Sequence, residues 1–338
     1  MMENNKIIGF AIYGCGMISK THAEALGEIE DAKLVGAADV KVDNAMAFAE
    51  RYKVKAFADY DELLACDEVD AVCICTPSGT HADLAIKALH AGKNVVLEKP
   101  MAITVEDCDR IIAACEETGR RLMVISQMRE KPDIIRAKEI IDSGRLGKIV
   151  VCNLQMKYYR SPEYYKGSWR GTKKLDGGGA LMNQGVHGID VLSFLCGKIK
   201  PASCQSLVRT LVHDIEVEDT AVAICEFESG ALGVITGTTS VYPGFNREIE
   251  ICASRGSIII RDGQIVRLVI KDDGIDETFD VAEGISSRDA SAVPTKWHKI
   301  QIERFIKATR GEAIVGLCDQ YQGKIAVELI KRIYENSI

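Results

Sequence analysis

Short apolar runs alternate with helix-period segments over the first third of the chain. The runs are rich in Val, Ile, Leu and Cys, which is typical of strands in a parallel sheet that is buried on both faces. We expect strands at 6–13, 33–39, 69–76, 94–97 and 121–126, and helices at 18–26, 45–52, 81–91 and 105–118. This order of elements predicts an α/β domain.

The pattern changes after this point, because most of the remaining chain alternates with a period of two. Ile249 and Ile251, for example, share one face of an expected strand, opposite Glu248 and Glu250. We expect strands at 219–228, 231–240 and 247–252, with a tight turn at 229–230, and helices at 132–143, 298–309 and 320–334. The chain is therefore predicted to divide into an α/β domain, 1–126, and an α+β domain, 127–338, whose terminal helix could pack back on the first.

Charge and cysteine usage narrow the class of protein. The formal net charge of −7 over 338 residues disfavours a nucleic-acid partner. None of the 12 cysteines forms a Cys-x-x-Cys pair, so the sequence predicts no metal site. Reduced thiols in a cytoplasmic protein are the better interpretation of these cysteines.

The N-terminal region also has some features of a secretory signal. An apolar stretch, 7–18, follows Lys6 and precedes Ala23-Glu24-Ala25, which imitates a cleavage site. Glycines within the stretch and the weak charge before it favour a folded strand and loop instead. Since no apolar run reaches the roughly 18 residues of a spanning helix, no membrane partner is expected.

A glycine-rich turn stands between the first expected strand and helix. Gly14 permits a tight turn, Gly16 lets the backbone approach a pyrophosphate at the helix N-terminus, and Ser19 is small enough for close packing. Asp39 ends the second strand, where a carboxylate accepts from the ribose 2′-OH of NAD and repels the 2′-phosphate of NADP. The alternative is an ordinary tight turn with a surface aspartate, but this context favours a Rossmann domain that binds NAD.

Two further motifs carry groups suited to proton transfer. Glu98-Lys99-Pro100 follows an expected strand, at the sheet edge where ligands bind in open α/β folds. A partly desolvated lysine there can exchange a proton with a hydroxyl, although a solvated lysine at a loop start is the simpler interpretation. Asn183 and His187 follow three glycines and lie four residues apart on one helical face. A capped helix with a buried histidine would explain that second pattern equally well.

Together these motifs resemble the glucose-fructose oxidoreductase / inositol dehydrogenase (Gfo/Idh/MocA) family over most of the chain. The motifs that carry the resemblance are Gly14-Cys15-Gly16, Cys75-Thr76-Pro77 with His81, Glu98-Lys99-Pro100 and the segment from Gly177 to His187. The resemblance implies a Rossmann domain and a second domain with a large, mainly antiparallel, open-faced sheet that commonly supports homo-oligomers, such as dimers or tetramers.

The resemblance also implies roles for individual residues. Lys99 and His187 are expected to be the catalytic pair. In many members an aspartate stands where this chain has Asn183; an amide can orient a hydroxyl but cannot act as a base, so His187 is expected to take the proton. Residues expected to bind the cofactor are Gly14, Gly16, Met17, Ile18, Asp39, Thr76, Pro77, His81, Glu98 and Lys99.

Aromatic and arginine residues before the glycine run are candidates for substrate binding. Tyr158 and Trp169 suit the C–H faces of a sugar, and Arg160 and Arg170 suit a carboxylate or phosphate. Strand-end packing and a surface ion pair would account for them equally well. The histidines outside the motifs are expected to have packing, structural or exposed roles: His22, His213 and His298.

The sequence therefore predicts an NAD-dependent oxidoreductase that moves a hydride between nicotinamide and a secondary alcohol of a sugar, sugar derivative or cyclitol. Two alternatives remain open. One is a glycoside hydrolase that uses NAD for transient oxidation with no net redox change. The other is a non-catalytic NAD(H) sensor.

Overall fold

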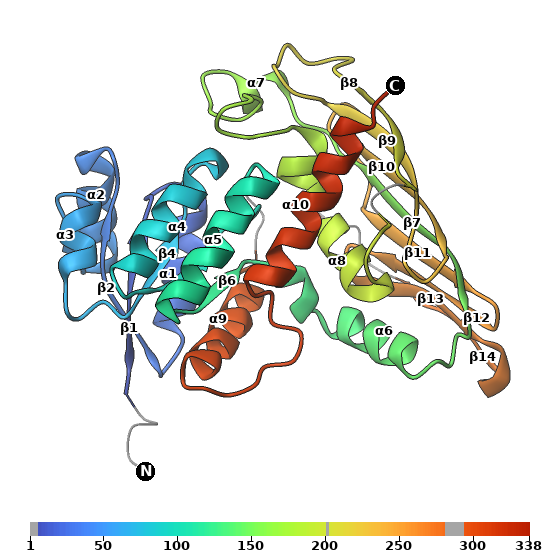
Figure 1. Ribbon diagram of the computed structural model, residues 1–338, viewed down its shortest axis with the longest axis horizontal. Coiled ribbons are helices and arrows are strands. Elements are labelled where there is room, and N and C mark those ends of the chain that lie inside the picture. Colours follow the sequence, from blue (N-terminus) through green and yellow to red (C-terminus); the bar gives the residue numbers. More distant parts are fainter. Residues whose placement is uncertain (1–5, 201–202, 281–293) are drawn as a thin grey trace. The chain divides into compact units, whose positions relative to one another are not determined.

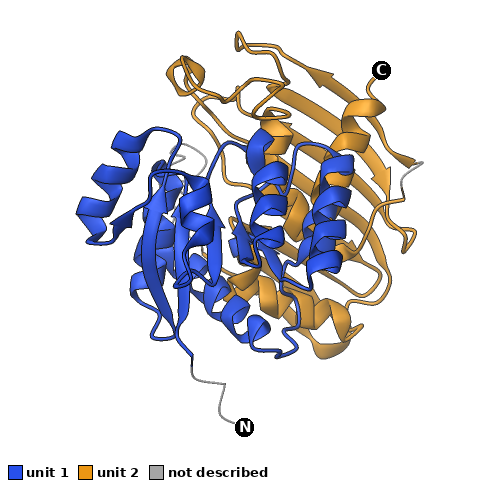
Figure 2. Cartoon of the chain, turned by 60° about the vertical axis from the view of Figure 1, so that its left-hand side comes forward, with its two compact units in different colours: residues 1–127, 293–324 blue, residues 128–292, 325–338 orange. Residues whose placement is uncertain are grey.

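The structure is a computed structural model that describes residues 6–200, 203–280 and 294–338. It contains two compact units, each made of two stretches of chain (Figure 2). The first unit consists of Met1–Gln127 and Val293–Lys324, and the second of Met128–Ala292 and Ile325–Ile338. The chain therefore leaves the first unit after Gln127 and returns to it near the C-terminus.

The first unit is built on a six-stranded parallel sheet of order β3-β2-β1-β4-β5-β6. Its strands are β1 (Ile8–Tyr13), β2 (Ala32–Ala38), β3 (Lys55–Ala56), β4 (Ala71–Ile74), β5 (Asn94–Leu97) and β6 (Leu122–Val124). The strand order reverses between β1 and β4, and ligands of open α/β sheets bind at the carboxyl ends of the strands beside such a reversal. The predicted doubly wound α/β fold is confirmed.

Helices cover both faces of this sheet (Figure 1). They are α1 (Met17–Gly27), α2 (Val42–Tyr52), α3 (Tyr60–Ala65), α4 (His81–His90), α5 (Val105–Thr118) and α9 (Thr295–Thr309). α1 and α9 pack together, as do α4 and α5, and right-handed crossovers place α1 and α4 on opposite faces. Phe10 of β1, Leu26 of α1 and Phe305 of α9 are at most 1% exposed in the core that joins α9 to the sheet.

The second unit contains an eight-stranded sheet of order β14-β13-β12-β11-β7-β10-β9-β8. Its strands are β7 (Ile149–Lys157), β8 (Gln205–Arg209), β9 (Thr220–Glu226), β10 (Leu232–Thr238), β11 (Glu248–Ala253), β12 (Gly256–Arg261), β13 (Gln264–Ile270) and β14 (Ile275–Thr278). Among these pairings only β10 with β7 is parallel, so the sheet is mainly antiparallel, as predicted.

One face of this sheet carries α6 (Pro132–Asp142) and α8 (Val186–Cys196), while the other face is open (Figure 1). The period-two pattern explains the difference: Ile249 and Ile251 are at most 2% exposed on the covered face. The remaining α-helices of the described residues are α7 (Pro162–Tyr165) and α10 (Gln320–Glu335). The boundary between the two units falls within α10, after Lys324.

The open face is apolar over β8, β9 and β10. Ile224 pairs directly with Val234, and Val222 pairs directly with Leu207. Five apolar residues on this part of the sheet have exposed fractions between 39% and 60%: Leu207, Val222, Ile224, Leu232 and Val234. We call these five residues the open-face patch. Within the described ranges, none of the helices has the length and apolar character needed to cross a membrane.

Candidate active site

The turn between β1 and α1 places its two glycines in different surroundings. Gly14 has φ +95°, and a Cβ there would lie 2.8 Å from the Cys75 carbonyl oxygen, so both conformation and space exclude a side chain. Gly16 is exposed, and a Cβ there would meet no atom of the described residues within 4 Å. Met17, 56% exposed, and the half-buried Ile18 then begin α1. The open space before α1 fits a pyrophosphate that approaches the backbone closely.

Asp39 follows β2 and accepts hydrogen bonds from three protein donors. Its Oδ2 accepts from the Cys15 N–H at 2.8 Å, and its Oδ1 accepts from the Lys41 N–H at 2.8 Å and the Asn44 amide at 3.3 Å. A carboxylate offers about four lone-pair positions, so one on Oδ2 is left for a ribose hydroxyl. The same carboxylate also holds the glycine turn in place through Cys15.

His81 braces the loop that follows β4. Its Nδ1 lies 2.8 Å from the Pro100 carbonyl oxygen and its Nε2 lies 3.0 Å from that of Thr76. The ring is 1% exposed, and burial lowers the pKa of His81. In the same loop the Pro77 carbonyl accepts the Thr80 N–H at 2.9 Å. His81 thus ties the ends of β4 and β5 together, and its expected effect on the cofactor would pass through the backbone of Thr76 and Pro100.

Glu98, at the end of β5, forms a buried ion pair with His22 of α1. The Glu98 Oε1 lies 2.8 Å from His22 Nε2 and 3.7 Å from His298 Nε2 of α9, and all three side chains are at most 8% exposed. Burial opposes the charge on Glu98, but the hydrogen bond from His22 and the nearby His298 ring outweigh it and hold the pKa of this carboxyl well below its ordinary value. The carboxylate expected at the cofactor is therefore bound by protein partners, and it joins α1, β5 and α9.

His22 carries the positive charge of this pair. Burial opposes the imidazolium, but Cys75, Cys73 and Glu98 outweigh burial and raise the pKa of His22 well above its ordinary value. Burial raises the pKa of the Cys75 thiol to about 11, and the carboxylate of Glu98 lies 2.8 Å from His22 Nε2. The pKa of His298 is lowered by burial.

The same three side chains also resemble a ligand set for a metal ion. Their candidate ligand atoms in His22, Glu98 and His298 all lie within 4.8 Å of one another. The 2.8 Å between His22 Nε2 and Glu98 Oε1 is the length of a charge-assisted hydrogen bond, and a protonated imidazole cannot bind a metal. We therefore describe the cluster as an ion pair with a neutral histidine beside it.

Lys99 follows directly after Glu98, and its backbone N–H donates to the Glu98 carboxylate at 3.3 Å. The side chain is half-buried. β1, β4 and β5 are neighbouring parallel strands, so Lys99, the Gly14 turn and the Thr76 loop lie at one edge of the sheet. The first unit therefore gathers its candidate cofactor residues and its candidate catalytic lysine at a single edge.

In the second unit, a buried glutamate orders the glycine run before α8. Glu218 Oε2 accepts from the Gly179 N–H at 2.7 Å, and its Oε1 accepts from the Leu181 N–H at 2.8 Å and from the Tyr334 hydroxyl at 2.7 Å. A Cβ on Gly179 would lie 1.8 Å from the Glu218 carbonyl oxygen, and one on Gly178 would lie 2.2 Å from the Tyr334 hydroxyl. Burial raises the pKa of Glu218. Glycine is therefore required at both positions, because Glu218 and Tyr334 approach the backbone too closely for a side chain.

The expected helix after the glycines begins as a π-helical turn, Ala180–Gly185, and continues as α8. Asn183, in the π turn, is 8% exposed, whereas His187, in the first turn of α8, is half-buried. π-helical turns occur often at functional sites. The α-helical spacing used to place these residues on one face therefore applies only from Val186 onward.

Asn183 is held by hydrogen bonds on both sides of its amide. Its Nδ2 donates to Asp176 Oδ1 at 2.6 Å, and its Oδ1 accepts from Gln184 Nε2 at 2.8 Å. Gln184 Nε2 also lies 3.0 Å from the Tyr164 hydroxyl, and Arg160 donates to Gln184 Oε1 at 2.8 Å. The network joins the glycine segment to the loop that contains the expected substrate residues.

The expected substrate residues lie in different environments. Tyr158 and Arg160 are each 3% exposed, and the Arg160 guanidinium lies 5.3 Å from the Tyr158 ring centre. Trp169 and Arg170 are half-buried, and the Arg170 guanidinium lies 4.8 Å from the Tyr164 ring centre and 5.0 Å from that of Trp169. Arg170 is the more accessible cation.

Several residues that order this region were not predicted from the sequence. Asp176, Glu218 and Tyr334 are buried hydrogen-bonding partners of the glycine segment. Asp176 adjoins the glycine run, which is a signal that could have identified it. Glu218 and Tyr334 stand far from the run in sequence and carry no motif.

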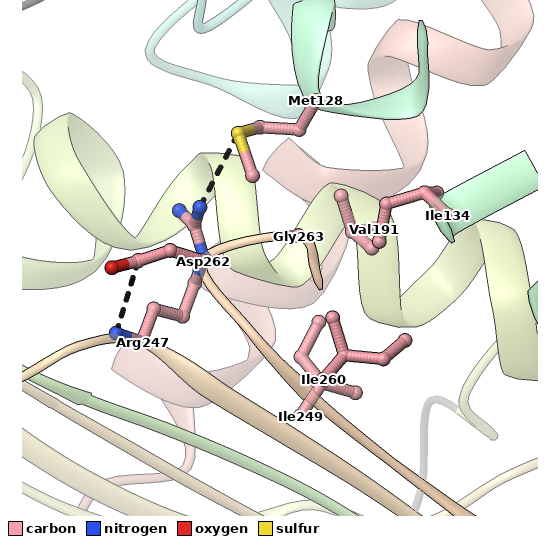
Figure 3. Close-up of a pocket in the computed structure, with 8 residues that line it drawn as sticks. All are labelled: Met128, Ile134, Val191, Arg247, Ile249, Ile260, Asp262 and Gly263. Carbon is pink, nitrogen blue, oxygen red and sulfur yellow. Dashed lines mark hydrogen bonds between the residues drawn. The ribbon is translucent and has the colours of Figure 1, made fainter. Parts of the chain in front are cut away.

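A narrow pocket in the second unit lies apart from the candidate residues (Figure 3). Arg247 donates to Asp262 Oδ1 at 3.2 Å through its backbone N–H, and its side chain contacts the Met128 sulfur at 3.3 Å. The residues that line it are Met128, Ile134, Val191, Arg247, Ile249, Ile260, Asp262 and Gly263. These side chains leave no space for a water molecule, so we describe the pocket as a packing feature.

Comparisons with known proteins match both parts of the chain. An oxidoreductase-family model with an NAD-binding Rossmann fold matches residues 8–126, and the GFO/IDH/MocA C-terminal domain matches residues 134–259. The chain is 30% identical to a myo-inositol 2-dehydrogenase of Thermotoga maritima over 268 residues, which cover 78% of each chain. It is 29% identical to an inositol 2-dehydrogenase of Rhizobium meliloti, again with 78% of each chain covered.

A solved structure matches nearly the whole chain. The WlbA dehydrogenase of Bordetella pertussis, in complex with NADH and UDP-GlcNAcA, is 31% identical and has a TM-score of 0.86. The match covers 98% of this chain and 96% of that one.

The surroundings of Gly16 lead to a prediction for cofactor affinity. Because a methyl group at Gly16 would meet open space, Gly16→Ala should fold with an unchanged melting temperature. It should weaken NADH binding at least about tenfold, since the methyl group would occupy the place of the pyrophosphate. Gly27→Ala is the matched control, because a Cβ at the end of α1 also meets no described atom within 4 Å. Titration of NADH fluorescence measures both; equal affinities would contradict a pyrophosphate at Gly16.

The buried ion pair predicts how stability depends on pH. The pKa of His22 is raised in the folded protein above its value of about 6.5 in the unfolded chain, so the pair contributes fully below that pH. Its contribution is lost as the pH rises through the folded pKa. From pH 6.5 to 9, the melting temperature of the natural protein should therefore fall more than that of His22→Gln. The exposed His90→Gln variant should keep the natural slope, and equal slopes in all three proteins would rule out a charged His22.

Proposed function

The chain belongs to the Gfo/Idh/MocA family of NAD-binding oxidoreductases, and from this premise we propose how its residues divide the work of the reaction. The protein is an NAD-dependent dehydrogenase that transfers a hydride between nicotinamide and a secondary alcohol of a sugar, sugar derivative or cyclitol. The observation that supports the assignment of residues is that Lys99 follows β5 at the same carboxyl edge of the sheet as the open glycine turn after β1.

Oxidation of an alcohol requires both hydride transfer and removal of the hydroxyl proton. NAD, when bound, accepts the hydride. We propose that Lys99 and His187 remove the hydroxyl proton. Each is half-buried, so it is partly shielded from water and still accessible to a substrate. Asn183 cannot act as a base, and its amide orients the substrate hydroxyl.

The arginines favour a substrate with an anionic group. Arg160 is buried and hydrogen-bonded to Gln184, so it serves the protein network. Arg170 is half-buried, and its guanidinium stacks on Tyr164 and Trp169, which leaves its edge suited to a carboxylate or phosphate. The WlbA relative was crystallised with UDP-GlcNAcA, which carries both groups, and we propose a sugar of this anionic class over a neutral cyclitol.

The open-face patch supports a homo-oligomer. Its five apolar residues lie on adjacent strands, so they form one continuous surface that water would otherwise contact. A second copy of the same sheet buries such a patch by two-fold symmetry. We further propose that the protein works in the cytoplasm, where its 12 free thiols would remain reduced.

An absorbance assay for NADH tests the function and the role of Lys99. Purified protein with NAD should turn over an anionic sugar, such as a nucleotide-linked uronic acid, faster than inositols, free sugars or methyl glycosides. Lys99→Ala should lower turnover about 10²- to 10⁴-fold, while NADH affinity stays close to that of the natural protein.

The results separate the alternatives. Preference for an inositol would contradict the anionic class but keep the dehydrogenase. Turnover that is unchanged in Lys99→Ala would overturn the role of the lysine. Glycoside cleavage without NADH would instead identify a redox-neutral hydrolase.

The open-face patch predicts the effect of a charge on assembly. Ile224→Glu places a carboxylate in the middle of the patch, at a residue that is 53% exposed, so the protein should dissociate into monomers. Val315→Glu makes the same change at a residue that is 92% exposed in the first unit, and it should leave the mass unchanged. Sedimentation velocity reports both masses. A natural protein that is monomeric, or an Ile224→Glu oligomer of natural mass, would contradict association through this patch.

A further inference from the structure

A chain of three hydrogen bonds with charged ends runs through the second unit. Arg160 Nη2 donates to Gln184 Oε1 at 2.8 Å, Gln184 Nε2 donates to Asn183 Oδ1 at 2.8 Å, and Asn183 Nδ2 donates to Asp176 Oδ1 at 2.6 Å. Asp176 is 1% exposed, Arg160 3% and Asn183 8%. Three of its four side chains are therefore buried, and Gln184 is half-buried, so a broken bond between the buried groups is costly.

The charged ends determine which way both amides point. A guanidinium can only donate, so it requires the oxygen of Gln184; a carboxylate can only accept, so it requires the nitrogen of Asn183. Turning the Asn183 amide by half a rotation would bring its oxygen against the Asp176 carboxylate and its nitrogen against Gln184 Nε2. Both bonds would be lost at once, so the amide has a single stable orientation.

Asp176 is itself held in place. Its Oδ2 accepts the Gly171 N–H at 2.8 Å, and its own N–H donates to the Thr172 carbonyl at 3.1 Å. The other end of the chain is also anchored, because Arg160 donates to the Tyr159 carbonyl at 2.8 Å. The orientation of Asn183 is thus set by two charged groups that are themselves hydrogen-bonded to the backbone.

We propose that Asp176 is a positioning residue of the dehydrogenase reaction, which acts through Asn183 by fixing the direction of its amide. The proposal rests on the function proposed above for Asn183, which orients the substrate hydroxyl. A correctly directed amide offers the substrate the same donor or acceptor in every turnover; a reversed amide would offer the opposite group. Asp176 therefore affects the rate of the chemical step more than the binding of NAD.

Asp176→Asn tests this with little change of size. The amide that this variant introduces can keep the bond from the Gly171 N–H only by presenting its own nitrogen to the Asn183 nitrogen, and two donors then face each other. We expect kcat to fall about 10- to 100-fold, the scale of a misplaced catalytic group, with a smaller change in KM and an unchanged affinity for NADH. Tyr165→Phe is the control. It removes the 2.9 Å hydrogen bond from the Tyr165 hydroxyl to Thr239, which is not one of the three bonds that join Arg160 to Asp176, and kcat should stay within about twofold of the natural value.

The exchange variant Asp176→Asn/Asn183→Asp tests whether the hydrogen bond between positions 176 and 183 sets the direction of the chain. In it the nitrogen of the side chain at position 176 donates to a carboxylate at position 183, which still accepts from Gln184, so every bond of the chain is restored with the charge moved. The melting temperature should rise above that of Asp176→Asn. Asn183→Asp alone brings two carboxylates together, and should be the least stable of the three variants.

Two results would overturn the proposal: natural kcat in Asp176→Asn, or an exchange variant whose melting temperature is no higher than that of Asp176→Asn. If the natural protein oxidises no substrate in the panel, the proposed function fails instead. The melting temperatures of the four proteins then still report whether the chain has the inferred direction, because recovery of stability in the exchange variant does not depend on turnover.

Discussion

Buried carboxylates that require hydrogen bonds are the constraint on which the functional regions of both units depend. A buried carboxylate is costly unless donors surround it, so each one draws separate segments of chain together. In the first unit Glu98 joins α1, β5 and α9 through two histidines. In the second unit Glu218 orders the glycine run and Asp176 holds Asn183. The candidate catalytic residues are neighbours of these three anions in sequence or in space.

The same constraint explains the glycines of the second unit but not Gly16 of the first, although both stand in glycine-rich motifs. Gly179 and Gly178 are small because Glu218 and Tyr334 approach their backbone from elsewhere in the second unit. Gly16 has no protein neighbour within 4 Å in the described residues, so packing does not account for its size. Identical residues in similar motifs therefore have different surroundings in the two units, and the role of Gly16 in cofactor binding stays a prediction.

The sequence predicted the architecture because both of its periodicities are strong. The expected 94–97 strand and 105–118 helix coincide with β5 and α5, whereas β3 and α3 were missed because two and six residues are too few to show a period. The comparisons confirm the family, the NAD cofactor and the dehydrogenase activity. Glu218 and Tyr334 could not be predicted, because they lie far along the chain from the glycine run that they order. The catalytic roles of Lys99 and His187 stay predictions.

The π-helical turn has a consequence for how this segment can evolve. Such a turn holds one more residue than the α-helical turn it replaces, and it is maintained by Glu218, 39 residues away from Gly179. Deleting one residue between Ala180 and Gly185 would let the segment relax into an α-helix, and would rotate Asn183 by about 100° relative to α8. A change in length would therefore separate Asn183 from His187, because the π-helical turn sets the spacing between them.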